Sequence, residues 1–220
     1  MNKREVLVDT AFLEKLSCDG KNIDNFKKVL AELEFSPVIH PYIAANELDM
    51  FPYFGELVED GYMRVAEYSE FLCDETDKDF YKNVFIEIHD LMREYLAADN
   101  KKKQLDKLVL PHNQTIFTYR KASMSLGDVH IILMAFFMKM PIILTEDSDL
   151  ALLRTIANRK FNSGSYTLQI YNAVGLLKMI AQKPKPTLSK NDLVNIAKSI
   201  GEREHQSEIK QIWNNSHEDT

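Results

Sequence analysis

The residues of this sequence best suited to chemistry are four carboxylates: Asp9, Glu47, Asp128 and Asp147. Carboxylate oxygens are ligands that Mg²⁺ and Mn²⁺ prefer. Acids gathered at one place repel one another, and a bound cation relieves that repulsion. Such a cluster suits phosphodiester hydrolysis, in which one metal ion activates water and a second stabilises the leaving oxygen. A divalent-metal site is therefore expected if the fold brings the four together.

The apolar pattern predicts elements that would bring at least two of these acids to one edge of a sheet. Short apolar runs predict strands at four places: 5–8, 35–39, 142–144 and 167–171. Strands that alternate with helices indicate a central, mostly parallel sheet in a three-layer α/β/α sandwich. Ligands bind beyond the carboxyl ends of such strands. Asp9 and Asp147 each follow a predicted strand, so we expect them on the same edge.

Each acid also has a purely structural interpretation, because acidic side chains often cap helices. Ser125 and Asp128 have the spacing of a capping box at the start of an apolar helix. Asp147 or Asp149 could cap the helix predicted after the strand at 142–144. Asp9 could cap the helix that carries Phe12. Both interpretations stay open for these residues.

Glu47 is less easily explained by capping. It is predicted near the C-terminal end of a helix, beside Ile43 and Leu48, where the helix dipole disfavours a carboxylate. A carboxylate beside an apolar face also needs a partner. Glu47 therefore favours the metal-site interpretation.

The chain is expected to comprise a main domain, 1–185, and a helical C-terminal extension, 186–220. A charged helical insertion is predicted at about 53–107. Its clearest piece, 80–96, has five residues on one predicted apolar face: Phe80, Val84, Ile88, Leu91 and Tyr95. The extension could pack on the core, or it could dock a partner through four apolar residues: Ile196, Ile200, Ile209 and Trp213.

The net charge of −6 counts against nucleic-acid binding by the molecule as a whole. Local basic segments are the candidate nucleic-acid contacts: Arg120, Lys121, Lys101, Lys102 and Lys103. Arg120 and Lys121 are the stronger candidates, because they lead into the segment that carries Asp128. His130 would point away from Asp128 on a helix, and we interpret it as a packing or surface residue.

Several function classes are disfavoured by what the sequence lacks. Cys18 and Cys73 do not have zinc-ligand spacing and cannot form a disulfide framework. There is no Gly-rich phosphate-binding loop, no D-x-D after the first strand and no G-x-S-x-G. The start of the chain does not resemble a signal peptide, and the longest apolar stretch is broken by Lys139 and Pro141. We expect a cytoplasmic protein with no membrane partner.

The sequence resembles PIN-domain nucleases over roughly residues 5 to 182. The matching pieces are the first strand with Asp9-Thr10, the Asn46-Glu47-Leu48 segment on an early helix, Gly127-Asp128 at the start of an apolar helix, and the Thr145-x-Asp147-x-Asp149 segment after the next strand. The resemblance implies a PIN-like α/β/α sandwich and Mg²⁺- or Mn²⁺-dependent cleavage of RNA.

The resemblance also implies roles for individual residues. Asp9, Glu47, Asp128 and Asp147 would be the catalytic, metal-binding quartet, and Asp149 would be an additional or water-mediated ligand. Thr145 and Thr10 would support this quartet, Thr145 by a hydrogen bond to a carboxylate or a metal-bound water. Many family members have Asn where this chain has Ala11.

The leading hypothesis is a metal-dependent endoribonuclease, with the toxin of a toxin–antitoxin pair or a defence component as candidate roles. Its partners would be RNA, an antitoxin or other protein at the C-terminal extension, and a second copy in a homodimer. The alternative is a PIN-like scaffold that binds RNA or protein without cutting. Ala11 and the negative charge favour the alternative, whereas the four acids favour the nuclease.

Overall fold

Five parallel strands form the sheet in the computed structural model, which describes residues 3–98, 108–120, 125–161 and 167–217. In chain order the strands are β1 (Arg4–Val8), β2 (Phe35–Ile39), β3 (Arg64–Val65), β4 (Ile142–Leu144) and β5 (Gln169–Tyr171). Their order across the sheet is β3-β2-β1-β4-β5. The expected α/β architecture with a parallel sheet is therefore confirmed.

The central strands are apolar because helices cover both faces of the sheet. Val6, Leu7 and Val8 on β1 are fully buried, as expected for a strand enclosed on both sides. Leu7 is aligned with Val38 on β2 and with Ile143 on β4. This register places the carboxyl ends of β1 and β4 side by side.

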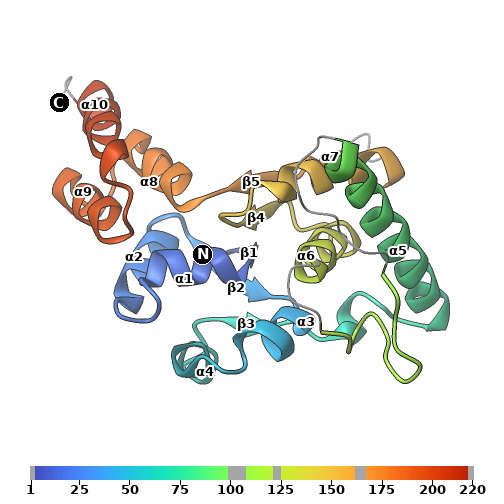
Figure 1. Ribbon diagram of the computed structural model, residues 1–220. Coiled ribbons are helices and arrows are strands. Elements are labelled where there is room, and N and C mark those ends of the chain that lie inside the picture. The colour runs from blue at the N-terminus through green and yellow to red at the C-terminus, as the bar shows by residue number, and fades with distance from the viewer. Residues whose placement is uncertain (1–2, 99–107, 121–124, 162–166, 218–220) are drawn as a thin grey trace.

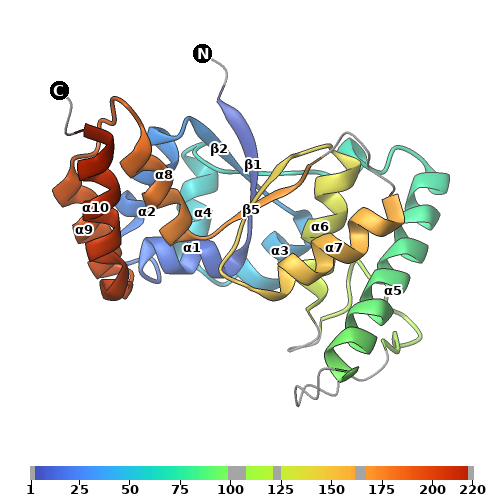
Figure 2. The same ribbon diagram turned by 90° about the horizontal axis from the view of Figure 1, so that it is seen from above.

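The helices form two layers, with the sheet between them (Figure 1 and Figure 2). One layer contains α1 (Thr10–Ser17), α2 (Ile23–Glu32) and α8 (Ala173–Gln182). The other contains α6 (Leu126–Phe137) and α7 (Asp149–Phe161), and α5 (Glu75–Ala98) packs on the outside of both.

Shorter elements complete the main domain. After β2 the chain forms α3 (Pro41–Ile43), the π-helix η1 (Ala44–Leu48) and α4 (Pro52–Glu59). After β3 it forms the 3₁₀ turn η2 (Tyr68–Glu70). No helix in the described ranges is long and apolar enough to cross a membrane.

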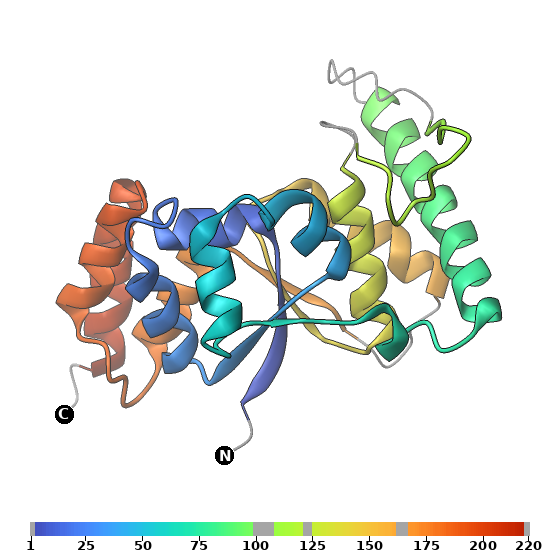
Figure 3. The same cartoon turned by 90° about the horizontal axis from the view of Figure 1, so that it is seen from below.

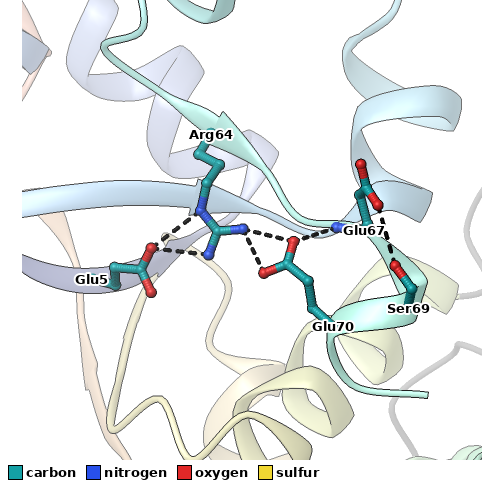
Figure 4. A network of polar contacts seen from close by, with 5 residues as sticks. All are labelled: Glu5, Arg64, Glu67, Ser69 and Glu70. Atoms are coloured by element: carbon teal, nitrogen blue, oxygen red, sulfur yellow. Dashed lines mark hydrogen bonds and ion pairs between the residues drawn. The ribbon is translucent and has the colours of Figure 1, made fainter. Parts of the chain in front are cut away.

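The insertion at 53–107 is not wholly helical, because its described part contains β3. Arg64 on β3 donates to Glu5 on β1 at 2.9 Å and to both carboxylate oxygens of Glu70 at 2.8 Å (Figure 4). Arg64 and Val65 are only partly buried. A strand of this length offers no alternating apolar pattern, so hydrophobic periodicity could not predict it.

The buried face of α5 is also rotated from the predicted one. Val84 and Ile88 are buried as expected, whereas Phe80 is 50% exposed and Tyr95 is 45% exposed. Tyr81 is fully buried in their place. The difference arises because α5 packs against both α6 and α7, and this tertiary environment is not encoded in the periodicity of one helix.

A chain of buried hydrogen bonds joins α5 to α6 and to the segment after β2. The Tyr42 N–H donates to His40 Nδ1 at 2.9 Å, which leaves His40 Nε2–H to face the Tyr81 hydroxyl at 3.3 Å. That hydroxyl donates to His130 Nδ1 at 2.8 Å, and His130 Nε2–H donates to Ile116 O at 2.9 Å. The interpretation of His130 as a packing residue is confirmed.

The C-terminal extension comprises α9 (Lys190–Ser199), the 3₁₀ turn η3 (Arg203–His205) and α10 (Gln206–His217). It packs against α8, at the end of the molecule opposite α5 (Figure 3). Ile196, Ile200 and Ile209 are buried within the chain. These three residues are therefore covered by the protein itself, which agrees with the first of the two expectations, packing on the core, and not with docking of a partner through them.

The buried carboxylate of Glu32, at the end of α2, holds the connection to α9. It accepts bonds from Lys183 Nζ at 2.8 Å, Thr187 N–H at 2.9 Å and Leu188 N–H at 3.1 Å, and also from the Thr187 hydroxyl. These bonds lower the pKa of Glu32 in spite of its burial, which acts in the opposite direction. The Pro-containing segment between α8 and α9 is thus tied to α2.

Replacing Tyr81 with Phe should destabilise the protein by about 1–3 kcal/mol, because it leaves buried nitrogens of His40 and His130 without a partner. Tyr95→Phe on the same helix is the matched control, since its exposed hydroxyl bonds only to Arg159 in the described part of the chain. It should change stability by less than about 0.5 kcal/mol. Urea unfolding of both variants measures the difference, and equal values would contradict the proposed network.

Candidate metal centre

A cavity of about 480 Å³ lies at the carboxyl edge of the sheet, and all four predicted carboxylates line it. Asp9 directly follows β1, and Asp147 comes shortly after β4. Glu47 lies in the π-helix η1, and Asp128 lies in the first turn of α6. Residues far apart in the sequence are thus brought to one place.

Asp9 does not serve as a helix cap, although it occupies the N-cap position of α1. Its side chain makes no capping bond, and its Oδ2 accepts a hydrogen bond from the Thr145 hydroxyl at 2.8 Å. Asp9 is only 6% exposed. Burial raises its pKa to about 6, the Thr145 bond opposes this rise, and the charge of Glu47 adds to it.

Thr145 connects the two acids that follow strands. Its hydroxyl oxygen accepts from the Asp147 N–H at 3.0 Å while its proton is donated to Asp9. Asp147 Oδ1 in turn accepts from the Asp149 N–H at 2.7 Å. Asp147 therefore supports the start of α7 as well as lining the cavity. Asp149, the predicted additional ligand, is the first residue of α7 and does not line this cavity.

Glu47 is held by contacts on two sides. Its Oε2 accepts from the Thr10 hydroxyl at 2.6 Å. On its other side, a Cβ added to Gly127 would lie 2.3 Å from Glu47 Oε1, so a side chain at position 127 would force the Glu47 carboxylate to move. Burial raises the pKa of Glu47. The π-helix that carries it is a rare element that is frequently found at functional sites.

Asp128 does not form the capping box that its spacing suggests. Ser125 adopts a left-handed conformation, with φ 51°, and its side chain makes no capping bond to the helix. A hydrogen bond instead joins the Ser125 and Asp128 side chains. Burial raises the pKa of Asp128 well above its usual value, and the charges of Asp9 and Asp147 raise it further.

Glu14, Tyr42 and Asn46 also line the cavity and were not predicted as site residues. Glu14 lies one turn after Thr10 on α1, so the helical spacing of four from Thr10 was the available signal. Burial raises the pKa of the Glu14 carboxyl, and its charge raises the pKa of Glu47.

Arg120 brings a positive charge to the cavity wall. Its guanidinium donates to Asn46 Oδ1 and to Ala45 O, and lies 3.6 Å from Asp49 Oδ2. These contacts fix Arg120 against η1. The other predicted basic contacts, Lys101, Lys102, Lys103 and Lys121, lie outside the described residues.

The donor set of the cavity fits a hard divalent cation. It offers carboxylate and hydroxyl oxygens, and the charges that act most strongly on Asp9 and Asp128 are all negative. Protonation or a bound cation must offset this charge, since carboxylates this close cannot all ionise without cost.

The tightest triad of potential ligands in the described ranges lies elsewhere, at Glu202, Glu204 and His205, whose ligand atoms are within 4.8 Å of one another. Glu202 is already paired with Lys15 at 2.5 Å, and His205 lies 3.3 Å from Glu208. This triad therefore belongs to a network of surface ion pairs. The carboxylates of the cavity are spaced more widely.

Comparison of the chain with family models, with curated proteins and with solved structures gives no match.

The Asp9→Asn protein should be the more stable one in the absence of metal at neutral pH. Asn keeps an oxygen for the Thr145 bond and removes the charge. Because folding raises the pKa of Asp9 from 3.8 to about 6, its contribution to stability is complete below pH 3.8 and is lost as the pH rises through 6. Wild type should lose about 1–3 kcal/mol relative to the variant between pH 4 and pH 8. Urea unfolding in EDTA measures this, and parallel pH profiles would refute it.

Gly127→Ala should weaken Mn²⁺ binding without removing any carboxylate, because the new methyl group displaces Glu47. We expect a loss of about 10–100-fold, similar to the loss of a residue that orients a metal ligand. Gly55→Ala is the matched control, since it is also a helical glycine and nothing lies within 4 Å of its added Cβ. Isothermal titration with Mn²⁺ compares the two, and unchanged binding in Gly127→Ala would contradict the assignment of Glu47.

Proposed function

We propose that this protein is a divalent-metal-dependent ribonuclease with a PIN-like fold. One observation carries the proposal: four carboxylates from separate elements line one cavity at the carboxyl edge of a parallel sheet. The all-parallel sheet with helices on both faces is the architecture that the family resemblance implies. The order of the acids along the chain also agrees with that resemblance.

In this proposal Asp9, Glu47, Asp128 and Asp147 hold the cation, Mg²⁺ or Mn²⁺. When bound, the cation would supply activation of water and neutralisation of the charge that develops on the phosphodiester. Mg²⁺ usually keeps several of its own waters, so not every one of the four carboxylates would have to contact the ion directly.

The surrounding residues position these ligands. Thr145 fixes one oxygen of Asp9, and Thr10 fixes one oxygen of Glu47. These two hydroxyls thereby limit the rotation of the two carboxylates. Gly127 provides the space into which Glu47 extends.

Arg120 is suited to hold the phosphate of the substrate. Among the described residues it is the one guanidinium in the wall of this cavity, and guanidinium N–H groups donate charge-assisted hydrogen bonds to phosphate oxygens. A bound cation together with Arg120 would offset part of the negative charge of the acids that line this cavity, which a polyanionic substrate requires.

A second candidate function is an RNA- or protein-binding scaffold that does not cut. One observation favours it: Ala11, which stands where many PIN nucleases have Asn, lines the cavity and offers no polar group. In that case the four acids would bind a cation that serves structure alone.

Digestion of total RNA with wild type and Asp128→Asn, with and without Mn²⁺, tests the proposal. Asp128→Asn should lower the Mn²⁺-dependent cleavage rate by about 100-fold or more, since loss of even an outer partner of a metal ligand costs about 10–100-fold. Asp60→Asn, an exposed acid at the end of α4, should cleave like wild type. Equal cleavage by wild type and Asp128→Asn would refute the assignment, and metal-dependent RNA binding without cleavage would support the scaffold.

A further inference from the structure

A second cavity, of about 420 Å³, adjoins the carboxylate cavity, and Asp147 forms part of the wall of both. It lies at the carboxyl ends of β4 and β5, where the Thr145 N–H donates to Tyr171 O at 3.0 Å. Its size is within the range of small-molecule sites. A polymer whose reacting bond lies among the four carboxylates would extend past Asp147 into this cavity.

Arg154, from α7, gives the second cavity a positive charge. Its Nη1 donates to Leu168 O at 3.4 Å. In the described part of the chain its guanidinium has no carboxylate partner within ion-pair distance. A guanidinium carries five N–H donors, so most of them remain for a ligand. A phosphate group is the ligand whose geometry they match.

Tyr171 provides an aromatic surface in the same cavity. The residue ends β5 and is only partly buried. An unpaired base stacks readily on an exposed aromatic ring, with little dependence on which base it is. Asn172 beside it accepts the Gly175 N–H at 2.8 Å through Oδ1, which leaves its amide N–H groups to bond a base edge.

The acid in this wall, Glu146, is already engaged. Its Oε1 accepts the Ala173 N–H at 2.7 Å, at the N-terminus of α8. A carboxylate there is stabilised by the positive end of the helix dipole. Glu146 therefore occupies the helix N-terminus itself, so the ligand's phosphate would be bound by Arg154.

We propose that the second cavity is a subsite for the nucleotide adjoining the cleaved phosphodiester, with its base stacked on Tyr171 and its phosphate bound by Arg154. The proposal rests on the proposed function, because it takes its substrate from it. The proposal implies that the substrate is single-stranded RNA, because a base in a duplex is not free to stack on a side chain.

Cleavage of a short single-stranded RNA of defined sequence tests the stacking. Tyr171→Leu should raise KM about tenfold with little change in kcat, because stacking acts equally on the bound substrate and the transition state. Tyr171→Phe keeps the ring and should restore the wild-type KM. Removing the base next to the cut on one side should abolish the difference between wild type and Tyr171→Leu, whereas removing it on the other side should not.

The role of Arg154 is tested with a matched pair on α7. Arg154→Gln should raise KM several-fold and reduce the dependence of KM on salt, as expected for a lost phosphate contact. Arg159→Gln removes the same charge from a side chain that bonds to Tyr95 on α5, and it should change neither. Equal effects of the two substitutions would overturn the phosphate assignment.

The subsite proposal and the proposed nuclease activity can be refuted independently of each other. If wild type cuts RNA and Tyr171→Leu has the same KM, the subsite is wrong and the proposed function stands. If wild type cuts nothing, RNA binding to the wild-type protein is measured in Mn²⁺ by fluorescence anisotropy. A loss of about tenfold on adding Tyr171→Leu would then support the subsite without the nuclease. No binding, or no loss, would overturn the subsite.

Discussion

Repulsion among buried carboxylates is the constraint on which the carboxyl edge of this protein depends. Burial and neighbouring negative charges raise the pKa values of Asp9 and Asp128, so without a cation the fold must hold these groups against mutual repulsion wherever they are ionised. It does so by attaching them to its most rigid parts. Asp9 follows the buried end of β1, residues Val6 to Val8, and the residues of β4 beside it are also buried. The hydroxyls of Thr145 and Thr10 then fix individual oxygens. Without a cation the carboxylate repulsion lowers the stability of the protein, and binding of a cation would restore that stability.

The insertion between Glu47 and Asp128 contributes to this rigidity from behind the cavity. Tyr81 on α5 bonds to His130, which lies two residues after Asp128, and faces His40, whose ring accepts the N–H of Tyr42 in the cavity wall. All three side chains are fully buried or nearly so. The added helix is therefore bonded to both segments that carry site residues. A displacement of α5 would therefore move the segments that carry Asp128 and Tyr42 through these hydrogen bonds.

The sequence was sufficient to predict the features that depend on local pattern. The strands at 5–8, 35–39 and 142–144 agree with β1, β2 and β4, and the four acids meet in one cavity. What it could not predict depends on tertiary partners. β3 is held by the ion pairs of Arg64 and not by apolar alternation. The buried face of α5 is set by two neighbouring helices. The one signal for Glu14 is its spacing of four from Thr10, and this spacing places it at the cavity only because α1 begins where β1 ends.

The buried carboxylate of Glu32 makes two distant parts of the chain depend on each other. Its bonding partners come from residues 183 to 188, and its side chain has no exposed surface. A recombination event that replaced the C-terminal helices would leave a buried charge without its donors, which is among the costlier defects a core can carry. The helices after position 182 and the acid at position 32 would therefore be inherited or lost as one unit. Distant relatives that lack the extension are expected to have an uncharged residue at the end of the second helix.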